Sequence, residues 1–313
     1  MKKAKKEIEV INSPMVGAAN AILKHKNKFN SLLGTSISCL VAIVAGASVG
    51  TYFGIVMSKP GINYDAFDPL SYEDDVSILM DKYNKNNSIS QFQPYDLVNI
   101  AAYKYANEEH TSSITHGQVK AAGVKQLIYA YDVHIGDDIF NESISYSSLV
   151  KCASRFYEGP AKIKEYLGSS VKESGTAKWK FDQEVTLEEH ENQWGKHLTR
   201  PLIYIVSSKT VLESNLEEQN DNYIVTLNLD PITSVLRYVK QMVKVSNLKK
   251  NPQFSSVQLT FTLDKELNLK QLDVSEKYTV YVVGENKSSA TLTQVFNHQS
   301  SEPIPDTETD IVY

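Results

Sequence analysis

One segment limits what this chain can fold into more than any other feature. Residues 32–57 form a run of 26 residues without a charged side chain, flanked by Lys28 and Lys59. About 20 apolar residues suffice to cross the hydrocarbon core of a bilayer as a helix. We therefore predict a transmembrane helix over 32–57.

The charge around this segment predicts its orientation. Residues 1–31 hold seven lysines and two glutamates, a net charge of +5, so the remaining residues carry −10 and bring the total to −5. A basic flank beside a transmembrane helix stays in the cytoplasm. We expect a cytoplasmic tail over 1–31 and an acidic extracytoplasmic part in the cell envelope, anchored by one membrane pass. This acidity excludes nucleic acid as an expected partner, because binding phosphates needs clustered lysine and arginine.

Other interpretations of the apolar segment fit less well. A cleaved signal peptide would begin earlier and be shorter. A lipoprotein signal would place its cysteine at the end of the apolar run, whereas Cys39 lies near the start. A buried helix of a soluble domain would be shorter and would not need the lysine flank. We therefore favour an uncleaved anchor in contact with membrane lipid.

Small residues recur at every fourth position within the predicted anchor, on one helix face: Ala42, Gly46, Gly50 and Gly54. Such ridges let two membrane helices approach closely. The ordinary abundance of glycine and alanine in membrane helices explains the pattern equally well. The ridge marks a candidate contact with a second copy or with a partner membrane protein.

The residues after the anchor divide into three parts. Residues 58–90 are polar and predict a stalk with one helix over 72–82, whose first turn would hold acidic residues. Residues 91–298 are long enough for a sizeable core and predict an extracytoplasmic α+β domain. Residues 299–313 are acidic, contain proline and predict a disordered tail.

Two helices of the domain are marked by their starts. Pro94 suits a first helical position, and apolar residues follow at helical spacing to Asn107. Asp230 and Pro231 predict the N-cap and first residue of a second helix, whose apolar stripe continues to Val243. Residues 149–157 also fit a helix, and 188–195 fit a short helix or a loop.

Alternating apolar and polar residues predict strands, because a half-buried strand repeats every two residues. The expected strands are 113–121, 125–133, 139–147, 161–167, 178–187, 202–207, 223–229, 257–263, 272–282 and 290–296.

The order of elements predicts the fold class. A helix followed by three strands occurs twice, over 94–147 and 231–297. We expect an α+β domain in which a curved antiparallel sheet, a half-barrel, packs helices on its concave face. The alternative is two smaller domains of the cystatin or NTF2 type.

No motif of catalysis, cofactor binding or metal binding stands out, and we expect no enzyme activity, no cofactor and no metal. Cys39 and Cys152 fall on different sides of the predicted membrane interface, so they form no disulfide within one chain. The acidic run around His190 could gather a cation but lacks the second histidine of a zinc helix. We interpret that run as a solvated helix start.

Tyrosines crowd the first half of the domain and supply the candidate ligand or partner surface: Tyr95, Tyr103, Tyr129 and Tyr131. Aromatic faces can line a binding cleft. Ordinary packing of half-buried strands is the competing explanation, and the one we favour from the sequence.

Three segments carry a family resemblance: the strand from Tyr223 that ends in Asp230-Pro231, the helix that follows, and the strand 255–265. In pattern, the chain resembles extracytoplasmic lipoprotein domains of the LolA/LppX type. The resemblance implies a curved antiparallel half-barrel that closes over helices and holds acyl chains. The predicted anchor departs from that family, which has a lipidated cysteine, and argues against a role as a lipid shuttle.

The sequence supports two hypotheses for function. The first is a membrane-anchored binding protein of the cell envelope that holds an apolar ligand or lipid. The second is a scaffold subunit of a membrane-spanning secretion or conjugation machine. A dry apolar cavity between sheet and helices that opens to solvent would favour the binding protein, and a filled core with an exposed apolar patch would favour the scaffold.

Overall fold

The computed structural model describes the part of the chain that follows the predicted anchor: residues 62–121, 123–147, 151–158, 162–169, 171–194, 201–246, 250–281 and 285–306. The predicted transmembrane helix, the basic tail and the ridge from Ala42 to Gly54 lie outside these residues. Within them, no helix combines the length and hydropathy needed to span a bilayer.

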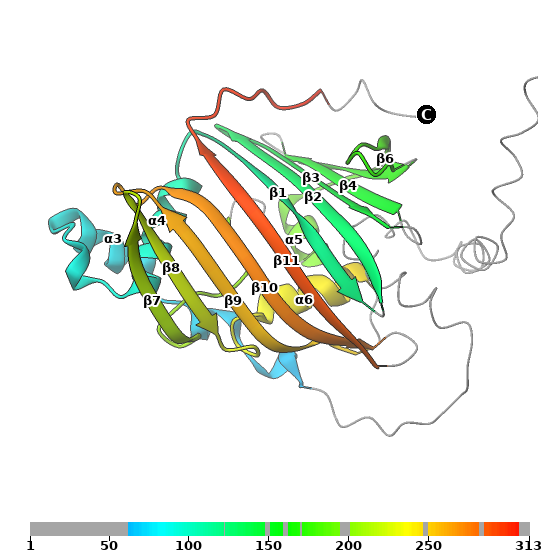
Figure 1. Ribbon diagram of the computed structural model, residues 1–313. Coiled ribbons are helices and arrows are strands. Elements are labelled where there is room, and N and C mark those ends of the chain that lie inside the picture. Colours follow the sequence, from blue (N-terminus) through cyan, green and yellow to red (C-terminus); the bar gives the residue numbers. More distant parts are fainter. Residues whose placement is uncertain are drawn as a thin grey trace, which may run out of the picture.

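The described strands join in one open antiparallel sheet of eleven strands (Figure 1). Their order across the sheet is β6-β5-β4-β3-β2-β1-β11-β10-β9-β8-β7. The first six are β1 (His110–Ala121), β2 (Val124–Ile135), β3 (Asp138–Tyr146), β4 (Lys151–Glu158), β5 (Ile163–Ser169) and β6 (Lys178–Val185). The other five are β7 (Val211–Gln219), β8 (Asn222–Leu229), β9 (Gln253–Leu263), β10 (Leu269–Tyr281) and β11 (Glu285–His298).

The two halves of the sheet meet where its first and last strands pair. β1 and β11 run antiparallel in continuous register from Thr111 opposite His298 to Ala121 opposite Ser288. The other neighbouring strands follow each other directly along the chain, apart from the connections that contain helices. One sheet therefore contains both of the helix-and-strand units seen in the sequence, as the α+β prediction with a single large sheet requires.

Helices cover one face of this sheet, which we call the inner face. α4 (Pro94–Ala106), α5 (Leu187–Trp194) and α6 (Leu236–Ser246) lie behind the strands in Figure 1. α3 (Val76–Lys85) packs beside α4 at the β7 edge. Three short 3-10 turns precede α4, at Tyr64–Ala66, Pro69–Tyr72 and Ile89–Gln91.

The main core lies between these helices and the strands β7 to β11 and β1. Leu97 and Ile100 of α4 and Val239 of α6 are fully buried there against alternate residues of the strands. The large apolar area removed from water is the main stabilising contribution to the domain. Tyr64 of the predicted stalk is buried in the same core, so that part of the stalk packs onto the domain.

A second, smaller core lies on the opposite face, over strands β3 to β6. Trp179 is buried there with Ile144 and Tyr166, and the Arg155 guanidinium lies 4.4 Å from the Trp179 ring centroid. Arg155 also pairs with Glu142 at 2.8 Å. Over β3 to β6, the face turned away from the helices is therefore packed as well.

The structure corrects several predicted elements. Residues 149–157 contain no helix: β4 covers Lys151–Glu158, because this segment pairs with β3 on one side and β5 on the other. Residues 202–207 are not a strand, although Tyr204, Ile205 and Val206 are buried. The sequence prediction missed β7, which is an edge strand with mostly exposed side chains and so has no alternating apolar pattern.

Both helices that follow an aspartate begin later than predicted. Asp230 accepts hydrogen bonds from the backbone N–H groups of Ile232 and Thr233, at 2.9 and 2.7 Å, and α6 begins only at Leu236. In the stalk, α3 begins at Val76 rather than at residue 72, with Asp75 as its N-cap. Asp75 therefore caps α3 itself, whereas Asp230 caps a turn that precedes α6.

Candidate functional site

The outer face of the sheet, which points away from the helices, carries its side chains in rows. Residues directly opposite each other on antiparallel strands share a face. Across β2, β1, β11, β10 and β9, the register therefore aligns two central rows. One row is Tyr129, His116, Thr293, Asp273 and Thr260; the other is Leu127, Gln118, Thr291, Ser275 and Gln258.

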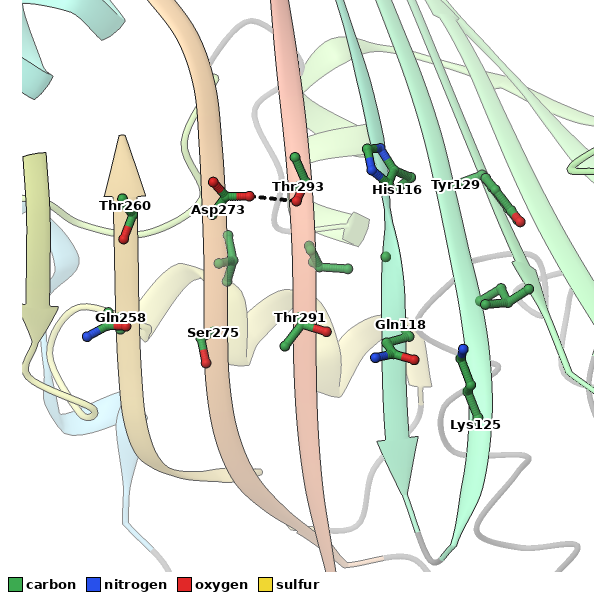
Figure 2. A pocket seen from close by; sticks show the side chains of 14 residues that line it. His116, Gln118, Lys125, Tyr129, Gln258, Thr260, Asp273, Ser275, Thr291 and Thr293 are labelled. Atoms are coloured by element: carbon green, nitrogen blue, oxygen red, sulfur yellow. Dashed lines mark hydrogen bonds between the residues drawn. The ribbon is translucent and has the colours of Figure 1, made fainter. Parts of the chain in front are cut away.

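These two rows line an open groove with a volume of about 620 Å³. Figure 2 shows the side chains of both rows on the face away from α6, with Lys125 near the start of β2 beside Gln118. The groove crosses the pairing of β1 and β11, so both halves of the sheet contribute to it. We take this groove as the candidate functional site.

The chemistry of the groove is largely that of uncharged hydrogen-bonding groups. Gln118, Ser275 and Thr291 form no side-chain hydrogen bond with any other residue that the structure describes. Amides and hydroxyls can both donate and accept hydrogen bonds. These groups are therefore free to bind a ligand rich in hydroxyl or carbonyl groups.

One carboxylate in the groove is already satisfied. Asp273 accepts a hydrogen bond from Thr293 Oγ1 and another from Gln271 Nε2, each at 2.6 Å. Figure 2 shows the Thr293 contact as a dashed line. These two donors fix the orientation of the Asp273 side chain, so the position of this carboxylate in the groove is defined.

An apolar row borders the groove on the side of Tyr129. Tyr131, Ile114 and Val295 lie opposite one another on β2, β1 and β11. Ile114 is 49% exposed and Val295 is 37% exposed. On the outer face, the apolar row and the groove are therefore adjacent, two residues apart along each strand.

Glycine at position 117 keeps the strands close beneath the groove. A Cβ atom there would overlap the Thr291 carbonyl oxygen and lie 2.7 Å from Leu292 Cα. β1 and β11 can therefore pair this closely at Gly117 only because the residue has no side chain.

The four predicted tyrosines divide between the two faces. Tyr129 lines the groove, and Tyr131 lies two residues along the same strand in the apolar row. Burial raises the pKa of the Tyr131 hydroxyl, and its ring packs edge-on against Phe140. Tyr95 packs against the main core, and Tyr103 is exposed on α4. The structure therefore brings Tyr129 and Tyr131 together but places Tyr95 and Tyr103 elsewhere.

A buried carboxyl group lies on the inner face, beneath α6. The Tyr204 hydroxyl donates to Glu276 Oε2 at 2.7 Å, and the Tyr238 hydroxyl donates to Oε1 at 3.3 Å. Burial raises the pKa of Glu276 to about 7, although the two hydroxyl donors partly offset this effect. Tight aromatic packing around Tyr238 and Phe254 makes this cluster part of the core.

The interpretation of His190 as part of a solvated helix start is wrong. Its ring is fully buried, packs edge-on against Phe156 and places Nδ1 2.7 Å from Glu165 Oε1. Gln183 donates to the other oxygen of Glu165. Among the residues that the structure describes, no three histidine, cysteine, aspartate or glutamate side chains are placed to bind a metal ion.

Comparison with known proteins gives neither a family nor a curated relative: no family model and no curated protein matches the sequence. Among solved structures, a DUF1329 family protein from Desulfovibrio piger is 9% identical, with a TM-score of 0.26 over 67% of this chain and 93% of that chain. MucB in complex with MucA(peri) is 8% identical, with a TM-score of 0.14 over 66% and 94% of the two chains. Similarities this weak indicate neither a family nor a function, so the candidate site is identified from the geometry of this structure alone.

The sequence contains only part of the signal for this site. The alternation in 257–263 and 290–296 identifies which residues share a face, but the register that aligns Gln118 with Thr291 and Ser275 depends on long-range pairing. Because β1 and β11 lie at opposite ends of the domain sequence, no local pattern could have predicted the groove.

Proposed function

We propose that this chain is a membrane-anchored, extracytoplasmic binding protein of the cell envelope that holds an amphipathic, lipid-like ligand on the outer face of its sheet. The observation that carries the proposal is the apolar row of Tyr131, Ile114 and Val295 beside a groove of free amides and hydroxyls. An amphipathic molecule could place its apolar part on the row and its polar part in the groove.

The packing of the inner face supports the outer face as the place of binding. A half-barrel of the LolA/LppX type would hold acyl chains between its sheet and its helices. Here, side chains such as Leu97, Val239 and Leu259 pack together in that layer. The proposal therefore keeps the half-barrel and the membrane anchor of the sequence prediction, but moves the ligand to the face that the helices leave open.

Blocking the groove tests the proposal. Full-length protein in nanodiscs of zwitterionic lipid would be titrated with a monoacyl phosphatidylcholine that carries a fluorophore on its chain. We expect saturable binding that Thr291→Trp weakens at least tenfold, because Thr291 lies exposed in the centre of the groove.

The matched control is Thr226→Trp. Thr226 of β8 lies on the same face, directly opposite Thr260 of β9, but it does not line the groove. It should bind the probe like the wild type. Equal binding by the wild type and Thr291→Trp, with both variants folded by circular dichroism, would contradict the proposal.

A second candidate function is the scaffold subunit, which the packed main core together with exposed apolar side chains favours by the criterion drawn from the sequence. Leu70 and Ile78 are each 68% exposed on consecutive helical segments, and neither segment has a buried residue. Such side chains suit a contact with a partner protein or a second copy. We expect native mass spectrometry of the full chain to show a discrete oligomer. The double substitution Leu70→Asp with Ile78→Asp should dissociate it. A monomeric wild type would rule out self-assembly through these residues.

A further inference from the structure

A row of lysines borders the groove on the side opposite the apolar row. Lys125 on β2 lies directly opposite Lys120 on β1, Lys120 lies opposite Ser289 on β11, and Ser289 lies opposite Lys277 on β10. Lys125 itself lines the groove, where Figure 2 shows it beside Gln118. We call Lys120, Lys125 and Lys277 the lysine row.

The arrangement of this row is costly without a counter-charge. Like charges directly opposite each other on paired strands destabilise a sheet, and Lys120 and Lys125 are such a pair. All three lysines are exposed, and none forms an ion pair with another residue of the described chain. An anion between them would turn this repulsion into attraction.

The lysine row is positively charged, whereas the rest of the chain after the predicted tail is acidic. The chain after residue 31 carries a net charge of −10, yet three lysines gather within four adjacent strands. Neighbouring strands lie about 4.8 Å apart, so Lys120 and Lys277, two strands apart, are separated by about 10 Å across the sheet. This spacing suits one multi-oxygen anion, such as a phosphate with its substituents, held from both sides.

We propose that the ligand of the groove has an anionic, hydroxyl-bearing head whose phosphate or carboxylate lies at the lysine row. This inference rests on the proposed function and specifies its ligand. The free groups of Gln118, Ser275 and Thr291 lie between the apolar row and the lysines, where they would bind the hydroxyl groups of the head. The fixed Asp273 carboxylate, one row further from the lysines, would repel an anion placed there.

The test compares two monoacyl lipids on the full-length protein in zwitterionic nanodiscs. Monoacyl phosphatidylglycerol has a net negative charge and two free hydroxyls on its head, whereas monoacyl phosphatidylcholine has no net charge. We expect monoacyl phosphatidylglycerol to bind at least tenfold more tightly than monoacyl phosphatidylcholine at low salt. Salt should reduce the advantage, because exposed charges are screened.

The variant that tests the row is the double substitution Lys120→Gln with Lys125→Gln. It should remove most of the preference for the anionic lipid and change binding of phosphatidylcholine less than twofold. The control is Lys85→Gln with Lys240→Gln, which removes the same charge from exposed lysines of α3 and α6. The control should keep the preference.

The outcomes separate the two proposals. If neither lipid binds, the proposed function fails. If both bind equally, or if the control abolishes the preference as fully as the lysine-row variant does, the lysine-row inference fails while the binding function stands. Glycerol 3-phosphate, which has the head of the lipid without its acyl chain, is then added as a competitor of monoacyl phosphatidylglycerol. Weak competition supports a lipid head as the source of the anion. Competition as strong as that of the lipid itself supports a free phosphate.

Discussion

The effect of single side chains is clearest at Gly117, where two strands approach too closely for any other residue. Its Cβ position overlaps the backbone of β11, which cannot move like the end of a flexible side chain. The cost of a substitution here therefore falls on the pairing of β1 and β11 rather than on a local turn.

We predict that Gly117→Ala lowers the free energy of unfolding by about 1 to 3 kcal/mol, the usual cost of overpacking. Urea titrations followed by circular dichroism would measure it. Gly136→Ala serves as the comparison, since its added Cβ meets nothing within 4 Å and costs only the strain of a positive φ. A loss at position 117 no greater than at 136 would contradict the prediction.

Glu276 gives the domain a defined pH dependence. Burial raises the pKa of this carboxyl from 4.5 to about 7 in the folded state. Between pH 4.5 and about 7, Glu276 is protonated to a greater extent in the folded state than in the unfolded state, so the free energy of unfolding falls as pH rises. The full fall is about 3 kcal/mol and is complete once pH exceeds the folded pKa.

We predict that Glu276→Gln removes this fall, because an amide does not ionise. Urea titrations from pH 4.5 to 8 would show it as a flat profile above about pH 6. Below that, a slope of the same sign should remain from Asp182, whose pKa burial raises to about 6. An unchanged profile in the variant would mean that Glu276 is not the group responsible.

At the scale of elements, the turns that begin helices differ in how much they hold together. Asp230 caps the turn between β8 and α6, and α6 buries Leu236, Val239 and Met242 in the main core. Asp75 caps α3 with similar geometry, but α3 has no buried residue. An aspartate therefore holds the turn that leads into a core helix in one place and caps a surface helix in the other.

We predict that Asp230→Ala lowers the free energy of unfolding by about 1 to 2 kcal/mol, because the N–H groups of Ile232 and Thr233 lose an acceptor like that of an N-cap. Asp75→Ala should reduce it by much less, because α3 can fray without opening the core. Thermal or urea unfolding of the two variants measures both effects. Equal losses would show that α3 is as strongly coupled to the core as α6.

The sequence predicted elements wherever burial is one-sided. The predicted helix 94–107 agrees closely with α4, and the predicted strands 257–263 and 290–296 lie within the longer β9 and β11, because alternate or helically spaced residues face one core. β4 was missed because Ala153 to Phe156 are buried on both faces, which removes the alternation. The groove was missed because polar rows on an exposed face resemble ordinary solvated surface.

At the scale of the whole molecule, one sheet joins two cores on different faces. The main core packs against the helix side of β7 to β11 and β1, and the smaller core around Trp179 packs against the other side of β3 to β6. β4 is covered on its helix side as well, where Phe156 packs against His190 of α5. The α+β class and the large antiparallel sheet follow from the sequence, but the second core on the face opposite the helices does not.

We predict that the halves unfold together in the wild type and separately when their junction is weakened. With Trp194→Phe as background, Trp179 fluorescence reports the smaller core alone, since these are the two tryptophans of the chain. Its urea midpoint should match that of circular dichroism. Adding Gly117→Ala should lower the fluorescence midpoint below that of circular dichroism; coincident midpoints in that variant would contradict the prediction.

The pairing of β1 with β11 also sets the order in which the chain can fold as it is made. β1 to β6 leave the ribosome early and can pair with one another, but β1 must wait for β11, the last strand among the described residues. Such distant pairing slows folding and leaves strand edges open in the meantime. A chain that stops before Glu285 would expose β1 and β10 at once, so we expect prematurely terminated copies to aggregate through these two edges.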